Sequence, residues 1–324
     1  MNEDSVIVTG GNSGIGFECA RALARAGRHV VIASRSRQAS AEAVRRVASE
    51  SGSDRIEAMD LDLASPASIR RFAADVDARN LPLQSLVCNA GLQFAKGPVL
   101  SEDGYELTFA VNHLGHFLLT NLLLSRLASR APSRIVIVSS GVHDGGRFTG
   151  MPKPRIADLQ TLAATGGATP GKFSGPIAYV NSKVCNLWFA YELARRLEAA
   201  GLGRGDHPIA INSFDPGLVP GSGLARAYPP AARFVWGSVM PAMASVLTRF
   251  VPGISTAPKS GAALAQLVLE PRLGAAGARY YPSRTRWYET PSSDQSYDVV
   301  RARELWEASI RMTGLANGES PLLG

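Results

Sequence analysis

Short apolar runs alternate with amphipathic stretches over roughly the first 215 residues of the chain. β-branched runs predict strands, and apolar residues that recur every three or four positions predict helices. Several strand-like runs are apolar throughout, as expected for strands covered on both faces of a parallel sheet. The predicted strands are Ser5–Thr9, Val30–Ala33, Ile56–Met59, Leu86–Cys88, Ile135–Val138, Ile209–Phe214 and Ala278–Tyr281, and helices are predicted at Gly14–Ala26, Ala39–Ser49, Ser260–Leu269 and Val299–Met312.

Repeated strand–helix–strand units predict right-handed crossovers and therefore an α/β fold. We expect residues 1–324 to form a single domain, a doubly wound parallel sheet of Rossmann type with helices on both faces. Two segments interrupt the alternation. Residues 144–176 are rich in Gly, Thr and Pro and predict a long insert loop, while residues 221–258 are apolar but contain many prolines and predict a broken helical lid over the substrate.

Composition indicates a globular protein. Hydrophobic residues make up 45% and charged residues 19% of the 324 residues, too apolar for a disordered chain. Three scattered cysteines argue against a secreted disulfide framework. The first residues lack a basic segment followed by an apolar one, so no signal peptide is expected. The longest near-apolar run, Phe234–Leu247, has 14 residues where a membrane span needs about 20. A cytoplasmic location is expected, with contact to a membrane surface the less favoured reading.

The formal net charge of +7 raises the question of nucleic-acid binding. Only five residues are lysine, and the arginines are spread along the chain rather than gathered in one block. We therefore expect no nucleic-acid partner. An anionic cofactor accounts for part of the excess charge.

A glycine-rich turn lies between the first predicted strand and the first predicted helix, at Thr9-Gly10-Gly11-Asn12-Ser13-Gly14-Ile15-Gly16. Glycines there allow a tight turn and let backbone N–H groups approach a pyrophosphate at the helix N-terminus. Glycine also marks ordinary turns. The position of this glycine-rich turn, after a strand and before a helix, favours dinucleotide binding.

The spacing Gly-x-x-x-Gly-x-Gly resembles that of the short-chain dehydrogenase/reductase family, and further motifs follow in the family's order. They are Asn89-Ala90-Gly91 after the fourth strand, Asn112 on the next long helix, Ser139-Ser140 at the end of the fifth strand, Tyr179-x-x-x-Lys183, and Pro216-Gly217 after the sixth strand. The ordered set covers roughly residues 4–220 and is far more specific than any one motif.

The catalytic residues expected from these motifs are Tyr179, Lys183, Ser140 and Asn112. Tyr179 and Lys183 are four residues apart, so on a helix they share one face, where an ammonium favours the phenolate needed for general acid/base chemistry. Ser140 can donate a hydrogen bond to a carbonyl that gains charge. The resemblance implies that Ser140 rather than Ser139 has this role, and that Asn112 holds a water behind Lys183. Each residue also has a purely structural interpretation. Tyr179 could pack on the sheet and Lys183 could be a solvated charge, while Ser140 could cap backbone groups and Asn112 could satisfy a backbone kink.

Cofactor choice follows from the end of the second strand. Ser34 stands where an NAD enzyme has a carboxylate for the ribose, and Arg35 follows, which favours the 2′-phosphate of NADP(H). Alternatively, Arg35 only stacks on the adenine. Asp62 resembles the family's adenine-contacting aspartate, although a helix N-cap is a competing interpretation. The full set of expected cofactor-binding residues is Gly10, Asn12, Ser13, Gly14, Ile15, Gly16, Arg35, Asp62, Leu63, Asn89, Ala90, Gly91, Tyr179, Lys183, Pro216, Gly217 and Val219.

No metal site is expected, because His113 and His116 share a helix face without a third ligand. Local strings resemble the family branch that holds retinol dehydrogenases and light-dependent protochlorophyllide reductases. They are Val111–Phe117, Asp158–Gln160 in the long insert, Ser182–Asn186 and Ala302–Ser309, and the strings Ser182–Asn186 and Gly221–Leu224 resemble the protochlorophyllide reductases more.

The leading hypothesis is an NADPH-dependent carbonyl reductase or alcohol dehydrogenase for a bulky apolar substrate. The runner-up is light-dependent reduction of a C=C bond of protochlorophyllide. Against it, Leu218 stands where such reductases usually have cysteine, Gly91 where they tend to have alanine, and Gln93 where they have an aromatic residue. A hypothesis of another class is a non-catalytic NADPH sensor. By family analogy, a homodimer or homotetramer is expected.

Overall fold

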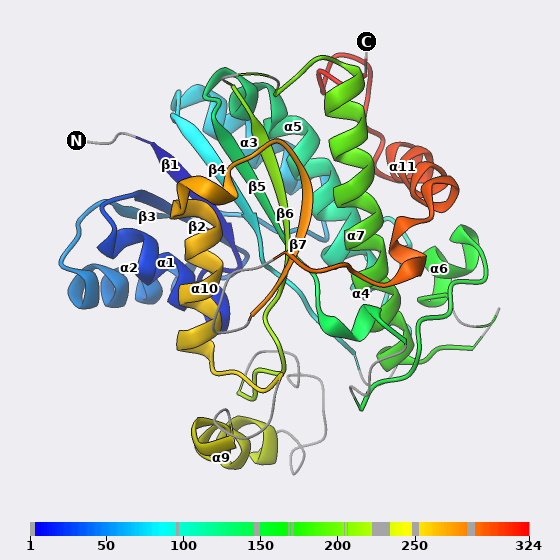
Figure 1. The fold of residues 1–324 in the computed structure, drawn as a ribbon, viewed down its shortest axis with the longest axis horizontal. Helices are drawn as coiled ribbons and strands as arrows, with labels where there is room; N and C mark the ends of the chain where they lie inside the picture. Colours follow the sequence, from blue (N-terminus) through cyan, green and yellow to red (C-terminus); the bar gives the residue numbers. More distant parts are fainter. Residues whose placement is uncertain are drawn as a thin grey trace.

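The computed structural model describes residues 4–323 apart from 95–96, 146–149, 168, 170–171, 204, 206, 222–233, 248–252 and 284–288. Its centre is a seven-stranded parallel sheet of order β3-β2-β1-β4-β5-β6-β7 (Figure 1). The order reverses between β1 and β4, which is where a doubly wound sheet opens a crevice for ligands. The strands are β1 (Ser5–Thr9), β2 (His29–Ser34), β3 (Ile56–Asp60), β4 (Leu83–Cys88), β5 (Ser133–Val138), β6 (Ile209–Asp215) and β7 (Gly277–Pro282).

Helices cover both faces of the sheet (Figure 1). One face packs against α1 (Gly14–Arg25), α2 (Arg37–Ser51) and α10 (Ala257–Leu269). The other packs against α3 (Pro66–Ala78), α5 (Gly115–Ser129), α7 (Gly175–Ala199) and α11 (Val299–Thr313). The helices α1 and α10 approach so closely that a Cβ on Gly261 would lie 2.3 Å from the Cβ of Glu18. The predicted fold class is therefore confirmed.

All seven predicted strands are present, and more than half of their ends extend one to three residues beyond the predicted bounds. The segment 144–176 differs from the long loop that its composition predicted. It contains α6 (Leu159–Thr165), whose first turn is capped by the Asp158 carboxylate, and α7 already begins at Gly175. Glycine and proline outside this helix dominated the composition and hid its short apolar stretch.

The helical segment Leu107–Ser129 is not regular. The short helix α4 (Leu107–Phe109) passes into a π-helical turn, Ala110–Leu114, which passes into α5. Within the described residues, this is the one helix long and apolar enough to cross a membrane, yet 89% of its most apolar window is buried inside the protein. Its apolar character is explained by its central position against the sheet.

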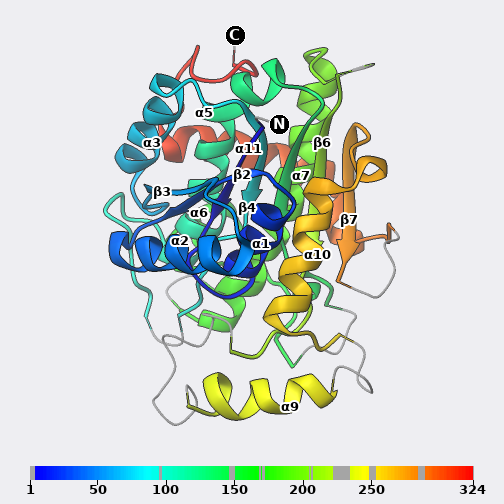
Figure 2. The same ribbon diagram turned by 90° about the vertical axis from the view of Figure 1, so that its left-hand side faces the viewer.

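The apolar excursion after β6 lies outside the layered body. A π-helical turn (Val235–Val239) leads into α9 (Met240–Leu247), and Figures 1 and 2 both show α9 set apart from the sheet. Phe234 and Met243 are 65% and 54% exposed. At its base, the Leu218 N–H donates to the Gly253 carbonyl, and the Ser255 N–H donates to the Leu218 carbonyl. The remainder of the predicted lid, 222–233 and 248–252, lies outside the described residues.

Candidate active site

The glycine turn after β1 is held by close backbone contacts. The Gly10 N–H donates to the Ala33 carbonyl at 2.8 Å, and Gly10 and Gly14 have φ of +64° and +56°, values that favour glycine. A Cβ on Gly16 would lie 2.5 Å from both the Gly10 carbonyl oxygen and the Asn89 Nδ2. The turn therefore cannot accept side chains without moving.

The N-terminus of α1 suits an anion. Ser13 precedes the helix in an extended conformation, and its side chain does not cap the first turn. The first backbone N–H groups of a helix have no intrahelical acceptor, and here the Ser13 side chain does not supply one. Asn12 is half-buried beside them. This arrangement fits the pyrophosphate of a dinucleotide.

A hydrogen-bonded wall joins β1 to the Asn89-Ala90-Gly91 segment. The Asn89 Nδ2 donates to the Thr9 carbonyl at 2.8 Å, and the Thr9 Oγ1 accepts from the N–H groups of Asn89 and Ala90 at 2.9 and 3.0 Å. The Thr9 hydroxyl also lies 2.9 Å from the Nε2 of His116, a ring that is buried in α5. Burial lowers the pKa of His116 to about 4, so this ring is neutral near pH 7. Sequence reasoning did not assign Thr9 or His116 to this wall.

Asn112 lies in the π-helical turn. Its Oδ1 accepts from the Leu92 N–H at 2.9 Å, and its Nδ2 donates to the Leu92 carbonyl and to the Ser182 hydroxyl, both at 3.0 Å. The Asn112 carbonyl accepts from the His116 Nδ1 at 3.2 Å. The side chain thus links the chain after Gly91 to α7. The predicted role in holding a water stays a prediction.

Tyr179 and Lys183 lie on one face of α7, as their spacing predicts. The Lys183 Nζ is 5.4 Å from the centre of the Tyr179 ring and donates to the Val138 carbonyl at 3.0 Å. A Cβ on Gly91 would lie 3.8 Å from the same Nζ, so β4, β5 and α7 meet at this ammonium. Burial lowers the pKa of Lys183 to about 8, and the nearby charge of Asp215 opposes that change.

The two serines after β5 have different environments. The Ser139 hydroxyl is buried and donates to the Lys183 carbonyl at 2.9 Å. Ser140 is half-buried, and within the described part of the chain its Oγ has only a long contact of 3.5 Å from the Val142 N–H. Ser140 therefore has the less constrained hydroxyl of the two, and its predicted catalytic role stays a prediction.

Asp215 is a buried carboxylate that sequence reasoning missed. It ends β6, is 8% exposed, and accepts from the Gly217 N–H at 2.9 Å through Oδ1. Its Oδ2 would lie 2.8 Å from a Cβ on Gly141, directly beside the Ser140 turn. Pro216 and Val219 are buried next to it. An acidic residue immediately before Pro-Gly, at the carboxyl end of a strand, was the available signal.

The end of β2 lacks the carboxylate that an NAD enzyme needs there. The Ser34 hydroxyl is 2.6 Å from that of Ser40 in α2. Arg35 is exposed and forms no ion pair with a described carboxylate, whereas Arg37 pairs with Asp60. This leaves the guanidinium of Arg35 available at the position of the predicted 2′-phosphate.

The β3–α3 connection holds the other residues predicted at the adenine. The Asp62 Oδ1 accepts from the Ala64 N–H at 3.0 Å, and the cap of α3 is Ser65. Asp62 therefore shapes the turn and does not cap the helix. Leu63 is buried, and its carbonyl would lie 2.3 Å from a Cβ on Gly115.

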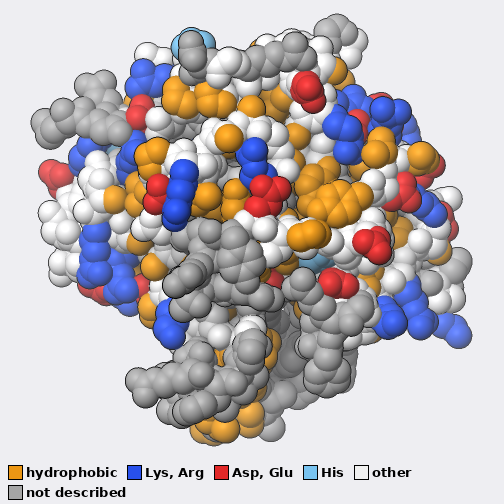
Figure 3. All heavy atoms as spheres, in the orientation of Figure 1, with side chains coloured by type: hydrophobic (Ala, Val, Ile, Leu, Met, Phe, Trp, Pro, Cys, Tyr) orange, Lys and Arg blue, Asp and Glu red, His pale blue; other side chains and the backbone are white. Residues whose placement is uncertain are grey.

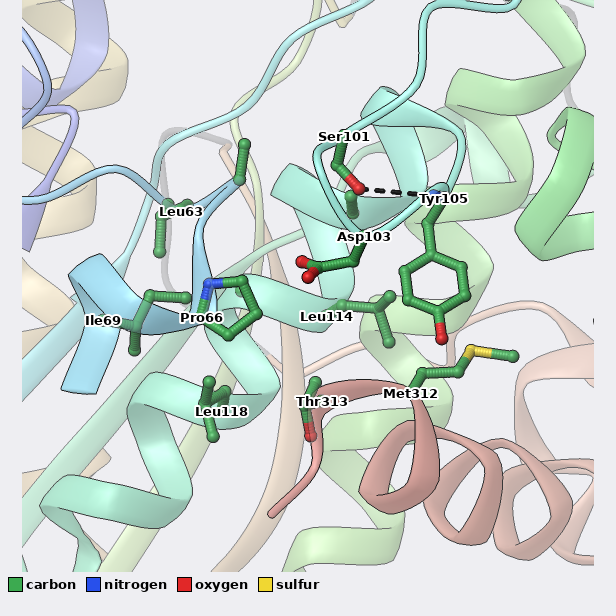
Figure 4. A pocket seen from close by; sticks show the side chains of 13 residues that line it. Leu63, Pro66, Ile69, Ser101, Asp103, Tyr105, Leu114, Leu118, Met312 and Thr313 are labelled. Carbon is green, nitrogen blue, oxygen red and sulfur yellow. Dashed lines mark hydrogen bonds between the residues drawn. The ribbon is translucent and has the colours of Figure 1, made fainter.

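A small apolar pocket lies behind this connection (Figure 4). Leu63, Pro66, Leu114 and Met312 line it, and the Asp103 carboxylate points into it. None of the predicted catalytic residues lines this pocket. Within the described parts of the chain, no group of three or more His, Cys, Asp or Glu side chains is arranged to hold a metal.

Comparisons with known proteins identify the family. A family model described as short chain dehydrogenase matches residues 4–151. Protochlorophyllide reductase B of Oryza sativa subsp. japonica is 33% identical over 332 residues, which covers 98% of this chain and 79% of that protein. The WW domain-containing oxidoreductase of Homo sapiens is 36% identical over 307 residues, covering 95% of this chain and 67% of that protein.

Solved structures share the fold. The NADP complex of Pseudomonas aeruginosa RhlG has a TM-score of 0.61 at 23% identity and covers 87% of this chain and 95% of that one. Actinorhodin polyketide ketoreductase with NADPH has a TM-score of 0.59 at 23% identity, covering 86% and 95%. The prediction of a nicotinamide dinucleotide as cofactor is confirmed at the level of the family. The chain belongs to the short-chain dehydrogenase/reductase family of oxidoreductases, in the branch of the protochlorophyllide reductases and the WW domain-containing oxidoreductase.

Proposed function

We propose that the protein is an NADPH-dependent reductase of a carbonyl group, or in reverse a dehydrogenase of the corresponding alcohol. The observation that carries this proposal is the meeting of Lys183, Tyr179 and the Ser140 turn at the carboxyl ends of β4 and β5. Lys183 donates to Val138 from a buried position, and Ser139 locks the adjacent turn onto α7. This is where ligands bind in open parallel sheets.

The three side chains divide the work of reduction. Nicotinamide, when bound, supplies the hydride. The Ser140 hydroxyl donates a hydrogen bond to the carbonyl oxygen as charge develops on it, and Tyr179 donates the proton that the oxygen finally keeps. The Lys183 ammonium stabilises the phenolate that Tyr179 becomes, because an opposite charge nearby favours the ionised form.

Preference for NADPH over NADH is supported by the end of β2. Among the described residues, no carboxylate forms an ion pair with Arg35, and the Ser34 hydroxyl is hydrogen-bonded to that of Ser40. A guanidinium donates paired hydrogen bonds to phosphate oxygens, which the 2′-hydroxyl of NADH lacks.

A bulky apolar substrate is supported by the material around the predicted crevice. Leu218 after the Pro-Gly step is 43% exposed, and the excursion that begins there presents Phe234 and Met243. Apolar side chains with few polar groups are typical of sites for large, weakly polar ligands.

The first experiment measures loss of NADPH absorbance in the dark with a panel of bulky aldehydes, ketones and quinones, beside NADH. Tyr179→Phe should lower turnover by about a thousandfold, because it removes the proton donor. NADPH affinity should stay within about threefold, since the ring remains. Retained turnover in Tyr179→Phe contradicts the assignment.

Light-driven reduction of a C=C bond is the second candidate. The match to protochlorophyllide reductases over nearly the whole chain favours it. Leu218, Gly91 and Gln93 depart from the pattern expected of those enzymes. Tight NADPH binding with no dark turnover, followed by turnover of protochlorophyllide under illumination, would establish this candidate. Binding without turnover in either condition would favour an NADPH sensor.

A further inference from the structure

His143 closes the short turn that follows the predicted carbonyl-polarising serine. Ser140 precedes the 3-10 helix Gly141–His143, and the imidazole folds back onto it. The Nδ1 of His143 lies 2.6 Å from the Ser140 carbonyl oxygen, and the backbone N–H of His143 donates to the same oxygen at 3.2 Å. The residue is 1% exposed, so water does not compete for these bonds.

The partners of the ring assign its tautomer. The Ser293 N–H donates to the Nε2 of His143 at 3.1 Å. A carbonyl oxygen can only accept and a backbone N–H can only donate. The proton is therefore on Nδ1, where it is donated to Ser140, and Nε2 is unprotonated. Both ring nitrogens are used in this neutral form, and the other tautomer would break both bonds.

A second connection runs from His143 to the helix of the catalytic tyrosine. The Gln295 Nε2 donates to the His143 carbonyl at 2.7 Å, and the Gln295 carbonyl accepts from the indole N–H of Trp188 at 2.8 Å. Trp188 is part of α7, which carries Tyr179. The Ser140 turn and the helix of Tyr179 are thus joined through a single residue, Gln295, in addition to the Ser139 contact.

Resting on the carbonyl reduction proposed above, we propose that His143 is a positioning residue for that reaction. Held between Ser140 and Ser293, it fixes the turn so that the Ser140 hydroxyl stands at a constant distance from the hydroxyl of Tyr179. Among the described residues, the Ser140 side chain has only its long contact with Val142, so its direction depends on its backbone. A displacement of about 1 Å can cost about a hundredfold in rate.

The first test needs no substrate. The chain has five histidines, so the ring nitrogens can be followed by ¹⁵N NMR of histidine-labelled protein, with His143→Asn to assign the signal. We expect a protonated Nδ1 in slow exchange and an unprotonated Nε2. The opposite tautomer, or an average of the two, overturns the proposal. Failure to reduce any carbonyl is a separate result, which bears on the proposed function.

The second test is a double-mutant cycle between His143→Ala and Ser140→Ala. Alone, His143→Ala should lower kcat by about tenfold to a hundredfold, with NADPH affinity unchanged. In the Ser140→Ala background, His143→Ala should lower kcat by less than about twofold, because the hydroxyl that His143 positions is absent. An equal cost in both backgrounds means that His143 acts on stability alone, and overturns the proposal.

A matched pair at Ser293 isolates the Nε2 bond if His143→Ala does not fold. Ser293 has a φ of −67°, the value that proline requires, and its Oγ has no hydrogen-bond partner among the described residues. Ser293→Pro removes the N–H donor, while Ser293→Ala keeps it. We expect kcat to fall at least about fivefold in Ser293→Pro and to stay within about twofold in Ser293→Ala. Equal rates in both variants overturn the proposal.

Discussion

The glycine turn after β1 and the excursion beyond β6 are built in different ways. Around β1 and α1, backbone atoms approach so closely that a Cβ on Gly16 would lie 2.5 Å from the Gly10 carbonyl oxygen. Beyond β6, the excursion through α9 leaves Phe234 65% exposed, and a Cβ on Gly237 would meet nothing within 4 Å. An added side chain at Gly16 would collide with its neighbours, whereas one at Gly237 would not.

The function proposed above accounts for this difference by what each region would recognise. A dinucleotide always presents the same pyrophosphate, which backbone N–H groups and a helix N-terminus bind without relying on side chains. A large apolar substrate presents mainly surface area, which many combinations of apolar side chains can cover. Figure 3 shows hydrophobic side chains of the excursion at the edge of the molecule, below a body where charges of both signs are interspersed.

The contrast between the two regions is tested most directly by placing the same methyl group in each of them. Gly16→Ala should weaken NADPH binding by about a hundredfold, because overpacking of this kind costs about 1–3 kcal/mol and displaces the turn. Gly237→Ala should leave NADPH binding unchanged. Fluorescence titration with NADPH measures both. Equal effects would contradict the contrast between the two regions.

A smaller effect is expected at the adenine end. Arg35→Ser should weaken NADPH binding by about tenfold or more, because it removes a charged donor to the 2′-phosphate, and should leave NADH binding unchanged. Arg37→Ser is the matched control. Since Arg37 pairs with Asp60, its loss should change NADPH affinity by less than about threefold. A larger loss of NADPH affinity in Arg37→Ser than in Arg35→Ser would assign the 2′-phosphate contact to Arg37.

A change in pH dependence is expected at the boundary between the two regions. The negative charge of Asp215 favours the ammonium form of Lys183, whose pKa burial lowers to about 8. Asp215→Asn keeps an acceptor for the Gly217 N–H but removes that charge, so the pKa of Lys183 should fall further. The loss of carbonyl reduction at high pH should therefore begin about one pH unit lower than in the wild type. An unchanged pH–rate profile would show that Asp215 does not influence Lys183.

The smallest effect is expected on the exposed excursion. Phe234→Ser should change the free energy of unfolding by less than about 0.5 kcal/mol, because the side chain is mostly in solvent. The KM for a bulky ketone should rise a few-fold while NADPH affinity is unchanged. Chemical denaturation and steady-state kinetics measure the two effects. A large loss of stability would place Phe234 in the folded core.

The sequence predicted the sheet well because each central strand is apolar over its whole length. Val6–Val8 and Val30–Ala33 are almost entirely buried, and runs of this kind have few alternatives. The short helix α6 was missed because seven residues among glycines and prolines give too little periodicity. The π-helical turn at Asn112 was also missed, because one additional residue per turn does not visibly disturb an apolar pattern.

The candidate site was predicted where spacing alone determines proximity. Tyr179 and Lys183 share a helix face because they are four residues apart. The glycine turn was predicted because the glycines lie between a strand and a helix. Asp215 and His143 were not predicted, because their roles depend on contacts with residues distant in sequence. His143 meets Ser293, which is 150 positions further along the chain.

The two hydrogen bonds between Leu218 and the Gly253–Ser255 segment have a consequence for how this protein can diversify. They join the two ends of the excursion at the sheet, so the intervening chain is an insertion closed at its base. The entropy of closing such an insertion depends weakly on its length, about 0.6 kcal/mol for each doubling. Its sequence and length can therefore vary during evolution, or be exchanged between relatives, while the dinucleotide site stays intact.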